Sequence, residues 1–191
     1  ARDIPAFVRV GENDRQVILK YLDLGASGAM IPQTSTAELA RDAIAAMRYS
    51  PLGLRGLAGG RTFDFGQGRP MPELVDAINE RVLSIIQFEH IDALAHLDDI
   101  LALPGLDVLF VGPSDLGQSM GYPGRYGVPE VESVIQQVVD RARAKGVALG
   151  IVAADAEGTN KRLEQGFQMV VTNVPALLTR ASKEMLSGIK R

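Results

Sequence analysis

The sequence contains no cysteine and no tryptophan among its 191 residues, and the missing cysteine excludes several kinds of site. Without cysteine the chain can form no disulfide, no thiolate nucleophile and no thiolate metal ligand. A metal ion would have to be bound by oxygen atoms or by the two histidines. The chain also lacks a basic cluster, and its formal net charge is -3, which argues against a nucleic-acid-binding surface.

No apolar run is long enough to span a bilayer, so we expect neither a membrane segment nor a membrane partner. The first five residues lack the layout of a signal peptide, which favours a cytoplasmic protein. With 46% hydrophobic and 23% charged residues, the composition suits one globular core, and we expect residues 1–191 to form a single domain. The expected ligand is a small molecule.

A pattern recurs along the chain: an amphipathic helix, a glycine, two or three further residues and an apolar strand. A glycine can close a helix in the left-handed conformation, and Gly25, Gly105, Gly146 and Gly166 stand at this point. Six strands are predicted, at residues 4–10, 28–31, 82–88, 108–111, 147–151 and 169–171. Alternating helices and continuously apolar strands indicate an α/β fold with a parallel sheet covered by helices.

The helices between these strands have their own signals. Ser35-Thr36-Ala37-Glu38 has the spacing of a capping box, and Pro129 suits the first position of a helix that ends before Gly146. Apolar residues at helical spacing, from Ile91 to Leu101, predict a further helix directly after Glu89.

Parallel units of this kind close into a TIM (β/α)₈ barrel or open into a doubly wound sheet. The first strand has no Gly-x-Gly-x-x-Gly turn, and polar residues follow most strands, which favours the barrel. The chain supplies about six of the eight units, and Ala1-Arg2-Asp3 resembles the tail of a helix. We therefore expect a partial TIM barrel from which the two N-terminal β/α units are missing.

Two consecutive strands end in a carboxylate, Glu89 after one and Asp115 after the next. An unpaired buried charge costs several kcal/mol, so a cation is expected where such strands end. Gln87 and Glu89 are two residues apart and would point to the same face of an extended strand. The alternative is that Glu89 caps the next helix and Asp115 only opens a turn.

Other polar residues are expected at the same edge of the sheet. Arg9 interrupts an apolar strand. It is expected either to form a salt bridge at the barrel rim or to donate hydrogen bonds to a developing enolate or a carboxylate. The remaining strand-end candidates are Gln33, Ser114, Thr172 and Asn173. Two carboxylates with open coordination positions suit a hard divalent ion such as Mg²⁺ or Mn²⁺.

No lysine falls at a strand end, so a Schiff-base mechanism is not expected. Both His90 and His96 are expected to be structural or solvated, which leaves no general base in the chain. The loop at residues 52–60 is rich in glycine but lacks the lysine of a P-loop. Within it Arg55 is a candidate substrate or subunit contact, although the glycines could also serve packing only.

Four motifs in order resemble the HpcH/HpaI aldolases over essentially the whole chain. They are Ala6-Phe7-Val8-Arg9-Val10, Ser50-Pro51-Leu52-Gly53-Leu54-Arg55-Gly56, Gln87-Phe88-Glu89, and Val111-Gly112-Pro113-Ser114-Asp115-Leu116 followed by Met120-Gly121-Tyr122-Pro123. The resemblance implies a metal-dependent class II pyruvate aldolase with a (β/α)₈ barrel, as a homo-oligomer that is usually a hexamer. Its substrates would be 4-hydroxy-2-oxo acids such as 2-keto-3-deoxy sugar acids, cleaved to pyruvate and an aldehyde.

The resemblance also implies roles for single residues. Glu89 and Asp115 would bind the divalent metal, which is Mg²⁺ or Mn²⁺ with Co²⁺ as a further alternative, and Arg9 would stabilise the pyruvate enolate. Gln87 would lie beside the metal, and the backbone N–H groups of Ser114 and Asp115 would hold the pyruvate carboxylate. The family's proton-transferring histidine lies on an earlier β/α unit and has no counterpart here. This favours a fragment of a longer aldolase over a shortened protein that has lost its base.

Two other functions are compatible with these residues. A CoA-ester lyase of the citrate lyase β-subunit or malyl-CoA lyase type has a similar barrel, arginine, glutamate and aspartate. Basic residues suited to the phosphates of CoA are lacking, however, which favours the aldolase. A non-catalytic barrel that serves in binding or assembly is the second alternative.

Overall fold

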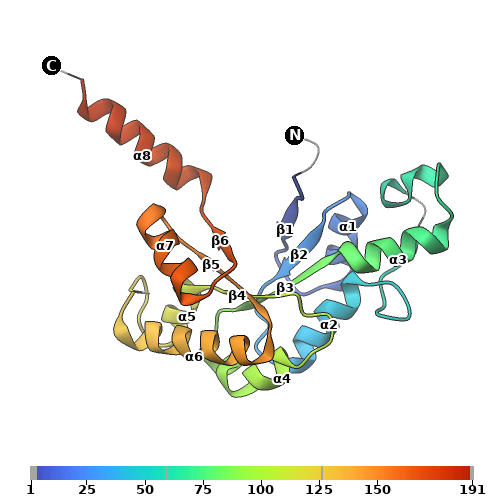
Figure 1. Cartoon of the computed structure of the whole chain (residues 1–191), viewed down its shortest axis with the longest axis horizontal. Coiled ribbons are helices and arrows are strands. Elements are labelled where there is room, and N and C mark those ends of the chain that lie inside the picture. Colours follow the sequence, from blue (N-terminus) through green and yellow to red (C-terminus); the bar gives the residue numbers. More distant parts are fainter. Residues whose placement is uncertain (1–3, 59, 126, 190–191) are drawn as a thin grey trace.

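The computed structural model describes residues 4–58, 60–125 and 127–189, and its centre is a single parallel sheet (Figure 1). The six strands lie in chain order and form a curled sheet, so each consecutive pair is connected by a crossover. They are β1 (Phe7–Arg9), β2 (Gly28–Ile31), β3 (Leu83–Phe88), β4 (Val108–Val111), β5 (Ala148–Val152) and β6 (Met169–Val171). The predicted α/β class, the six strands and the parallel sheet are confirmed.

The helices follow the strands as the repeating pattern predicts. They are α1 (Arg15–Asp23), α2 (Ala37–Met47), α3 (Met71–Arg81), α4 (Leu97–Leu101), α5 (Pro113–Ser119), α6 (Pro129–Lys145), α7 (Ala156–Gln165) and α8 (Val174–Ser187), with 3₁₀ segments η1 (Arg61–Gly66) and η2 (Ile91–His96). The predicted helix tail at Ala1-Arg2-Asp3 lies outside the described residues. No helix in the described ranges is both long and apolar enough to cross a membrane.

Helix ends account for two differences from the sequence prediction. The side chain that caps α2 is Thr36, whose hydroxyl accepts from the Leu39 N–H at 3.3 Å, so the cap lies one residue beyond Ser35. The segment after Glu89 is not one helix, because η2 precedes the short α4. Gly146, by contrast, ends α6 with φ of 70°, as predicted for a helix-closing glycine.

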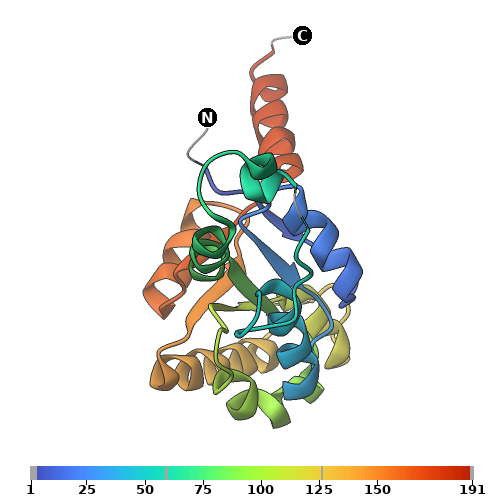
Figure 2. The same ribbon diagram turned by 90° about the vertical axis from the view of Figure 1, so that its right-hand side faces the viewer.

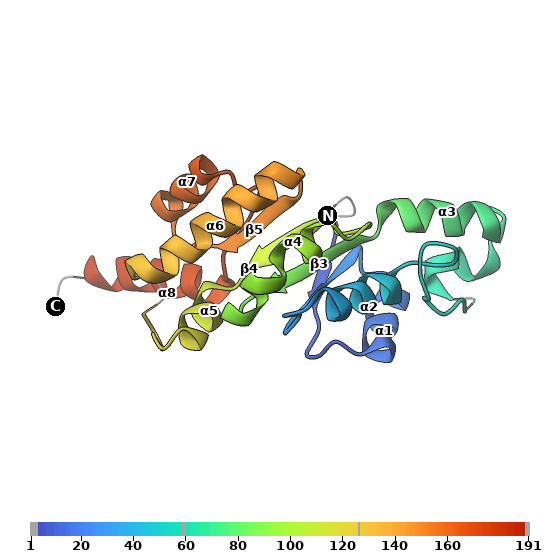
Figure 3. The same cartoon turned by 90° about the horizontal axis from the view of Figure 1, so that it is seen from below.

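Alternate residues of the strands face two different apolar layers. The larger core lies between the sheet and the helices, where Figure 3 shows α2, α4 and α6 along one face of the strands. A smaller cluster on the opposite face contains Ile85, Val108 and Phe110. Because Ile85 belongs to this inner cluster, the alternating side chains of β3 place Gln87 on the concave side as well.

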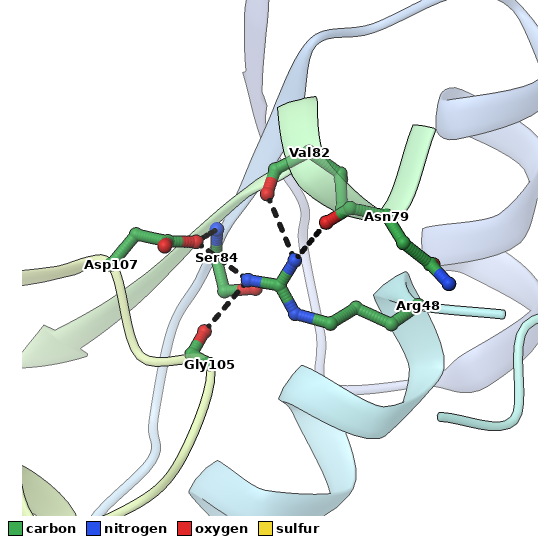
Figure 4. A network of polar contacts seen from close by, with 6 residues as sticks. All are labelled: Arg48, Asn79, Val82, Ser84, Gly105 and Asp107. Carbon is green, nitrogen blue, oxygen red and sulfur yellow. Dashed lines mark hydrogen bonds and ion pairs between the residues drawn. The ribbon is translucent and has the colours of Figure 1, made fainter. Parts of the chain in front are cut away.

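A buried arginine joins the amino-terminal ends of the strands (Figure 4). Arg48 donates to the carbonyl oxygens of Asn79, Val82 and Gly105 at 2.7, 3.3 and 3.0 Å, and it pairs with Asp107 at 2.8 Å. The same Asp107 carboxylate accepts from the Ser84 N–H at 2.7 Å. These contacts connect α2 and α3 to the starts of β3 and β4, and so hold in register the two strands whose far ends carry Glu89 and Asp115.

Helix α8 extends away from the rest of the fold (Figures 1 and 2). No residue of α8 is buried within this chain. Large apolar side chains are exposed along it, including Val174 at 73% and both Leu178 and Met185 at 66%. The strands β1 and β6 each pair with one neighbour only among the described residues.

Candidate active site

A cavity of about 590 Å³ lies where the carboxyl ends of β1 to β4 meet. Its lining includes Arg9 at the end of β1, Gln33 after β2, Gln87 and Glu89 at the end of β3, and Asp115 after β4. The carboxyl ends of parallel strands are where barrel enzymes carry out their chemistry. Side chains from four separate β/α units therefore converge in one place, as the sequence predicts for this edge of the sheet.

Glu89 is the most enclosed charged group of the cavity, with 7% of its surface exposed. Its Oε1 accepts from the Gln33 N–H at 2.8 Å, and its Oε2 accepts from Gln87 Nε2 at 2.9 Å. It does not cap the following segment, because His90 Nδ1 accepts from the Asp92 N–H there. Within the described ranges no cationic side chain pairs with Glu89, so this buried carboxylate has hydrogen bonds but no counter-charge.

Gln33 adopts a backbone conformation that is uncommon for a residue with a side chain, with φ of 55°. This turn directs its N–H at Glu89. Such conformations cost of order 1–3 kcal/mol and concentrate at functional sites. The strained turn after β2 thus contributes to the orientation of the Glu89 carboxylate.

Arg9 joins the same chain of contacts through one of its nitrogens. Its Nε donates to Gln87 Oε1 at 2.8 Å, so Gln87 lies between the guanidinium and Glu89. In the described part of the chain, neither terminal guanidinium nitrogen has a hydrogen bond or a carboxylate partner. The rim salt bridge considered for Arg9 is therefore not formed among these residues, and two nitrogens remain free to bind a ligand.

The donor set fits a hard divalent cation. Glu89 brings a buried carboxylate without a counter-charge, and Asp115 brings an exposed one in the first turn of α5 to the same cavity. In the chain as described, no group of three acidic or histidine side chains is placed to hold a metal ion. Two protein carboxylates, with water and substrate oxygens at the other positions, are a usual arrangement for Mg²⁺.

The comparisons with known proteins agree with the four motifs. The family model described as HpcH/HpaI aldolase/citrate lyase matches residues 1–177. The chain belongs to this family. It is 38% identical over 184 residues to a 2-keto-3-deoxy-L-rhamnonate aldolase of Klebsiella pneumoniae, a match that covers 96% of this chain and 68% of that protein.

Two further proteins are similarly close to this chain. A 2-dehydro-3,6-dideoxy-6-sulfogluconate aldolase of Pseudomonas putida is 36% identical over 186 residues, which is 96% of this chain and 71% of that protein. The crystal structure of a family protein from Burkholderia cenocepacia is 34% identical with a TM-score of 0.89, and the match covers 95% of this chain and 72% of that one. The predicted membership of this family is confirmed, and the aldolase relatives support a lyase.

Arg55 lies away from the cavity, at the opposite end of the sheet. It is buried, its Nη2 pairs with Asp23 at 2.9 Å, and its guanidinium lies 4.6 Å from the centre of the Tyr49 ring. Burial raises the pKa of the Tyr49 hydroxyl, so the ring stays neutral beside the cation. Within the chain Arg55 is therefore a structural cation, and its geometry does not support the predicted substrate contact.

The remaining sequence candidates are distributed as follows. Asn173 caps α8, because its Oδ1 accepts from the Ala176 N–H at 2.7 Å, and Thr172 lies beside α7 and α8 rather than in the cavity. Ser114 is exposed in the first turn of α5, next to Asp115. Lys20, Lys145, Lys161 and Lys183 are all on helices, whereas Lys190 lies outside the described residues.

Five polar lining residues were not selected as site residues from the sequence: Thr34, Ser35, His90, Gln118 and Ser119. The Thr34 hydroxyl donates to the Gln87 carbonyl oxygen at 3.1 Å. Gln118 and Ser119 lie at the far end of α5, where nothing in their spacing distinguishes them from solvent-exposed helix residues. A site formed by loops and helix ends brings such residues together only through the tertiary fold.

Gly112 allows the close approach of β4 to the Glu89 side chain. A Cβ atom at this position would lie 3.0 Å from Glu89 Cβ and 3.3 Å from its Oε2. With φ of -99°, alanine is compatible with the backbone, so only the crowding matters. We expect Gly112→Ala to keep the fold and weaken Mn²⁺ binding about tenfold, because the added Cβ must displace the Glu89 side chain and changes around a metal ligand typically cost ten- to a hundredfold in affinity.

Calorimetric titration with Mn²⁺ measures this effect. Gly11→Ala is the matched control, because a Cβ there meets no atom within 4 Å. Equal Mn²⁺ affinity in the two variants would show that the space at Gly112 has no bearing on Glu89.

Proposed function

We propose that this protein is a divalent-metal-dependent class II aldolase. It cleaves 4-hydroxy-2-oxo acids to pyruvate and an aldehyde, and catalyses the reverse addition. The observation that carries the proposal is the connected set of Arg9, Gln87 and Glu89 in one cavity with Asp115. Family membership and the aldolase relatives support the same reaction.

Each residue has a defined part in the proposed reaction. Glu89 and Asp115 hold the metal, a Mg²⁺ or Mn²⁺ ion, which when bound supplies Lewis-acid activation of the 2-oxo acid. The free nitrogens of Arg9 donate to the oxygen that becomes negative as the C3–C4 bond breaks. Gln87 keeps Arg9 and Glu89 in fixed relative positions, and the backbone N–H groups of Ser114 and Asp115 bind the substrate carboxylate.

The proposal includes a complete (β/α)₈ barrel and a homo-oligomer. Two further β/α units would pair with the open edges of β1 and β6, where an unpaired strand exposes backbone N–H and C=O groups. The proton acceptor for the 4-hydroxyl group would be a histidine on one of those units or a metal-linked water. The exposed apolar side chains of α8 support burial of this helix against another subunit, as in a hexamer.

Deuterium exchange at C3 of pyruvate tests the function directly. We expect the folded protein to exchange these protons in D₂O with Mn²⁺ present, as followed by proton NMR, and to stop when the ion is chelated. Turnover of acyl-CoA without pyruvate exchange would instead identify a CoA-ester lyase. A folded 191-residue chain that shows neither metal binding nor exchange would favour the non-catalytic barrel.

Borohydride provides a second test, because a lysine-dependent aldolase forms a reducible adduct with pyruvate. The described lysines all lie on helices, away from the cavity. We expect the mass of the protein to be unchanged after treatment with pyruvate and borohydride. A trapped adduct, detected by mass spectrometry, would refute the class II assignment.

A further inference from the structure

The two candidate metal ligands lie on different elements, and the sheet itself does not hold them together. Pairing between β3 and β4 ends at Phe88 and Val111, with one further bond from the Gly112 N–H to the Phe88 carbonyl oxygen at 2.9 Å. Glu89 follows the last paired residue of β3, and Asp115 lies within α5. The distance between the carboxylates thus depends on contacts beyond the sheet.

Ser119 makes such a contact with both segments. Its Oγ accepts from the Ile91 N–H at 2.9 Å and donates to the Leu116 carbonyl oxygen at 2.7 Å. Ile91 is two residues after Glu89, and Leu116 directly follows Asp115. One hydroxyl therefore connects the segment that carries one carboxylate to the helix that carries the other.

The chemistry of a hydroxyl suits this position. The Ser119 hydroxyl donates one hydrogen bond and accepts another. Hydrogen bonds that share a hydroxyl in this way polarise and strengthen each other. Ser119 is partly buried and also lines the cavity. Leu116 is fully buried, so α5 has a fixed anchor in the core on the other side of this bond.

We propose that Ser119 is a positioning residue of the metal site, which sets the separation of Glu89 and Asp115 through its two hydrogen bonds. The inference rests on the proposed function, since it takes these two carboxylates as metal ligands. Residues that orient metal ligands typically change affinity ten- to a hundredfold when they are removed. Ser119→Ala should therefore raise the Kd for Mn²⁺ by that factor.

The structure supplies a matched control in Ser187. Like Ser119, it is the last residue of its helix and donates to the carbonyl oxygen three residues earlier, Glu184 at 2.8 Å. Its hydroxyl makes no bond to a second segment in the described part of the chain. Ser187→Ala removes the same local bond without breaking a connection, and Ser119→Thr keeps the hydroxyl at the original position.

The test is a calorimetric titration of each metal-free protein, as the full 191-residue chain, with Mn²⁺ alone. We expect weaker binding in Ser119→Ala, and affinities within about threefold of the unaltered chain in Ser119→Thr and Ser187→Ala. Pyruvate C3 exchange in Ser119→Ala should recover most of its rate at saturating Mn²⁺, because the residue acts on metal affinity. Thermal unfolding of every variant is measured in parallel.

Other outcomes overturn the inference. If Ser119→Ala unfolds at a lower temperature but binds Mn²⁺ as the unaltered chain does, Ser119 has only a structural role. If the unaltered chain binds Mn²⁺ without exchanging pyruvate protons, the aldolase proposal fails, whereas the Kd comparison still decides the role of Ser119. A chain that binds no Mn²⁺ overturns both.

Discussion

Glu89→Gln is expected to eliminate Mn²⁺-dependent exchange at pyruvate C3. The substitution keeps the size of the side chain but removes the charge of a buried carboxylate that has no cationic partner among the described residues. Removing the charge of a ligand weakens the binding of a hard divalent ion more than changing a residue around that ligand does. We therefore expect the rate of pyruvate C3 exchange to fall by at least about a thousandfold. The rate is measured by proton NMR in D₂O at several Mn²⁺ concentrations.

The variant should fold normally. A neutral glutamine avoids the free-energy cost of burying a charge at this position. Its side-chain oxygen can still accept a hydrogen bond from the Gln33 N–H. Glu130→Gln is the control, because Glu130 is exposed in the first turn of α6 and its replacement changes the net charge equally. If Glu89→Gln retained full exchange, or if chelation left the unaltered protein active, the metal mechanism would be wrong.

Arg9→Lys is expected to separate enolate stabilisation from metal binding. Lysine keeps the positive charge but loses both the Nε–H donated to Gln87 and the planar pair of terminal nitrogens. Loss of one well-placed donor to a developing anion typically costs ~10²–10³ in rate. We therefore expect exchange at saturating Mn²⁺ to fall by about a hundredfold, with the Kd for Mn²⁺ within a few-fold of the unaltered value.

The comparison of rate with affinity decides the role of Arg9. Arg41→Lys, on the exposed surface of α2, is the control for the general effect of replacing an arginine by lysine. If Arg9→Lys lost both Mn²⁺ affinity and the rate of pyruvate exchange, the role of Arg9 would be to hold Glu89 in position through Gln87. An unchanged rate would remove Arg9 from the chemistry.

Much of the fold follows from local patterns. The apolar runs at residues 28–31, 108–111 and 169–171 coincide with β2, β4 and β6. For β2 and β4 the reason is burial, because a strand buried on both faces must be apolar throughout. The Pro129 start and the Gly146 end of α6 also agree, since both depend on the backbone preferences of single residues. Thr36 replaces Ser35 as the cap of α2 because neighbouring hydroxyl residues are equivalent locally, and packing selects between them.

The site was only partly predictable. Gln87, Glu89 and Asp115 stand out in the sequence because polar groups at the ends of apolar strands need a partner. Arg55 stands out equally, in a glycine-rich motif, yet it lies at the other end of the sheet beside Asp23. A motif shows that an arginine is present, but it does not show which end of the strands its loop approaches.

By itself the sequence determined a parallel α/β sheet, a family and a carboxylate pair without a competing lysine. These depend on residue type and spacing, which the chain carries directly. Only the tertiary structure decided that Gln87 links Arg9 to Glu89, that Gln33 and Gly112 enclose the carboxylate, and that Ser119 joins the segments carrying the two ligands. Such contacts arise between residues far apart in the chain, and the curvature of the sheet brings them within hydrogen-bonding distance.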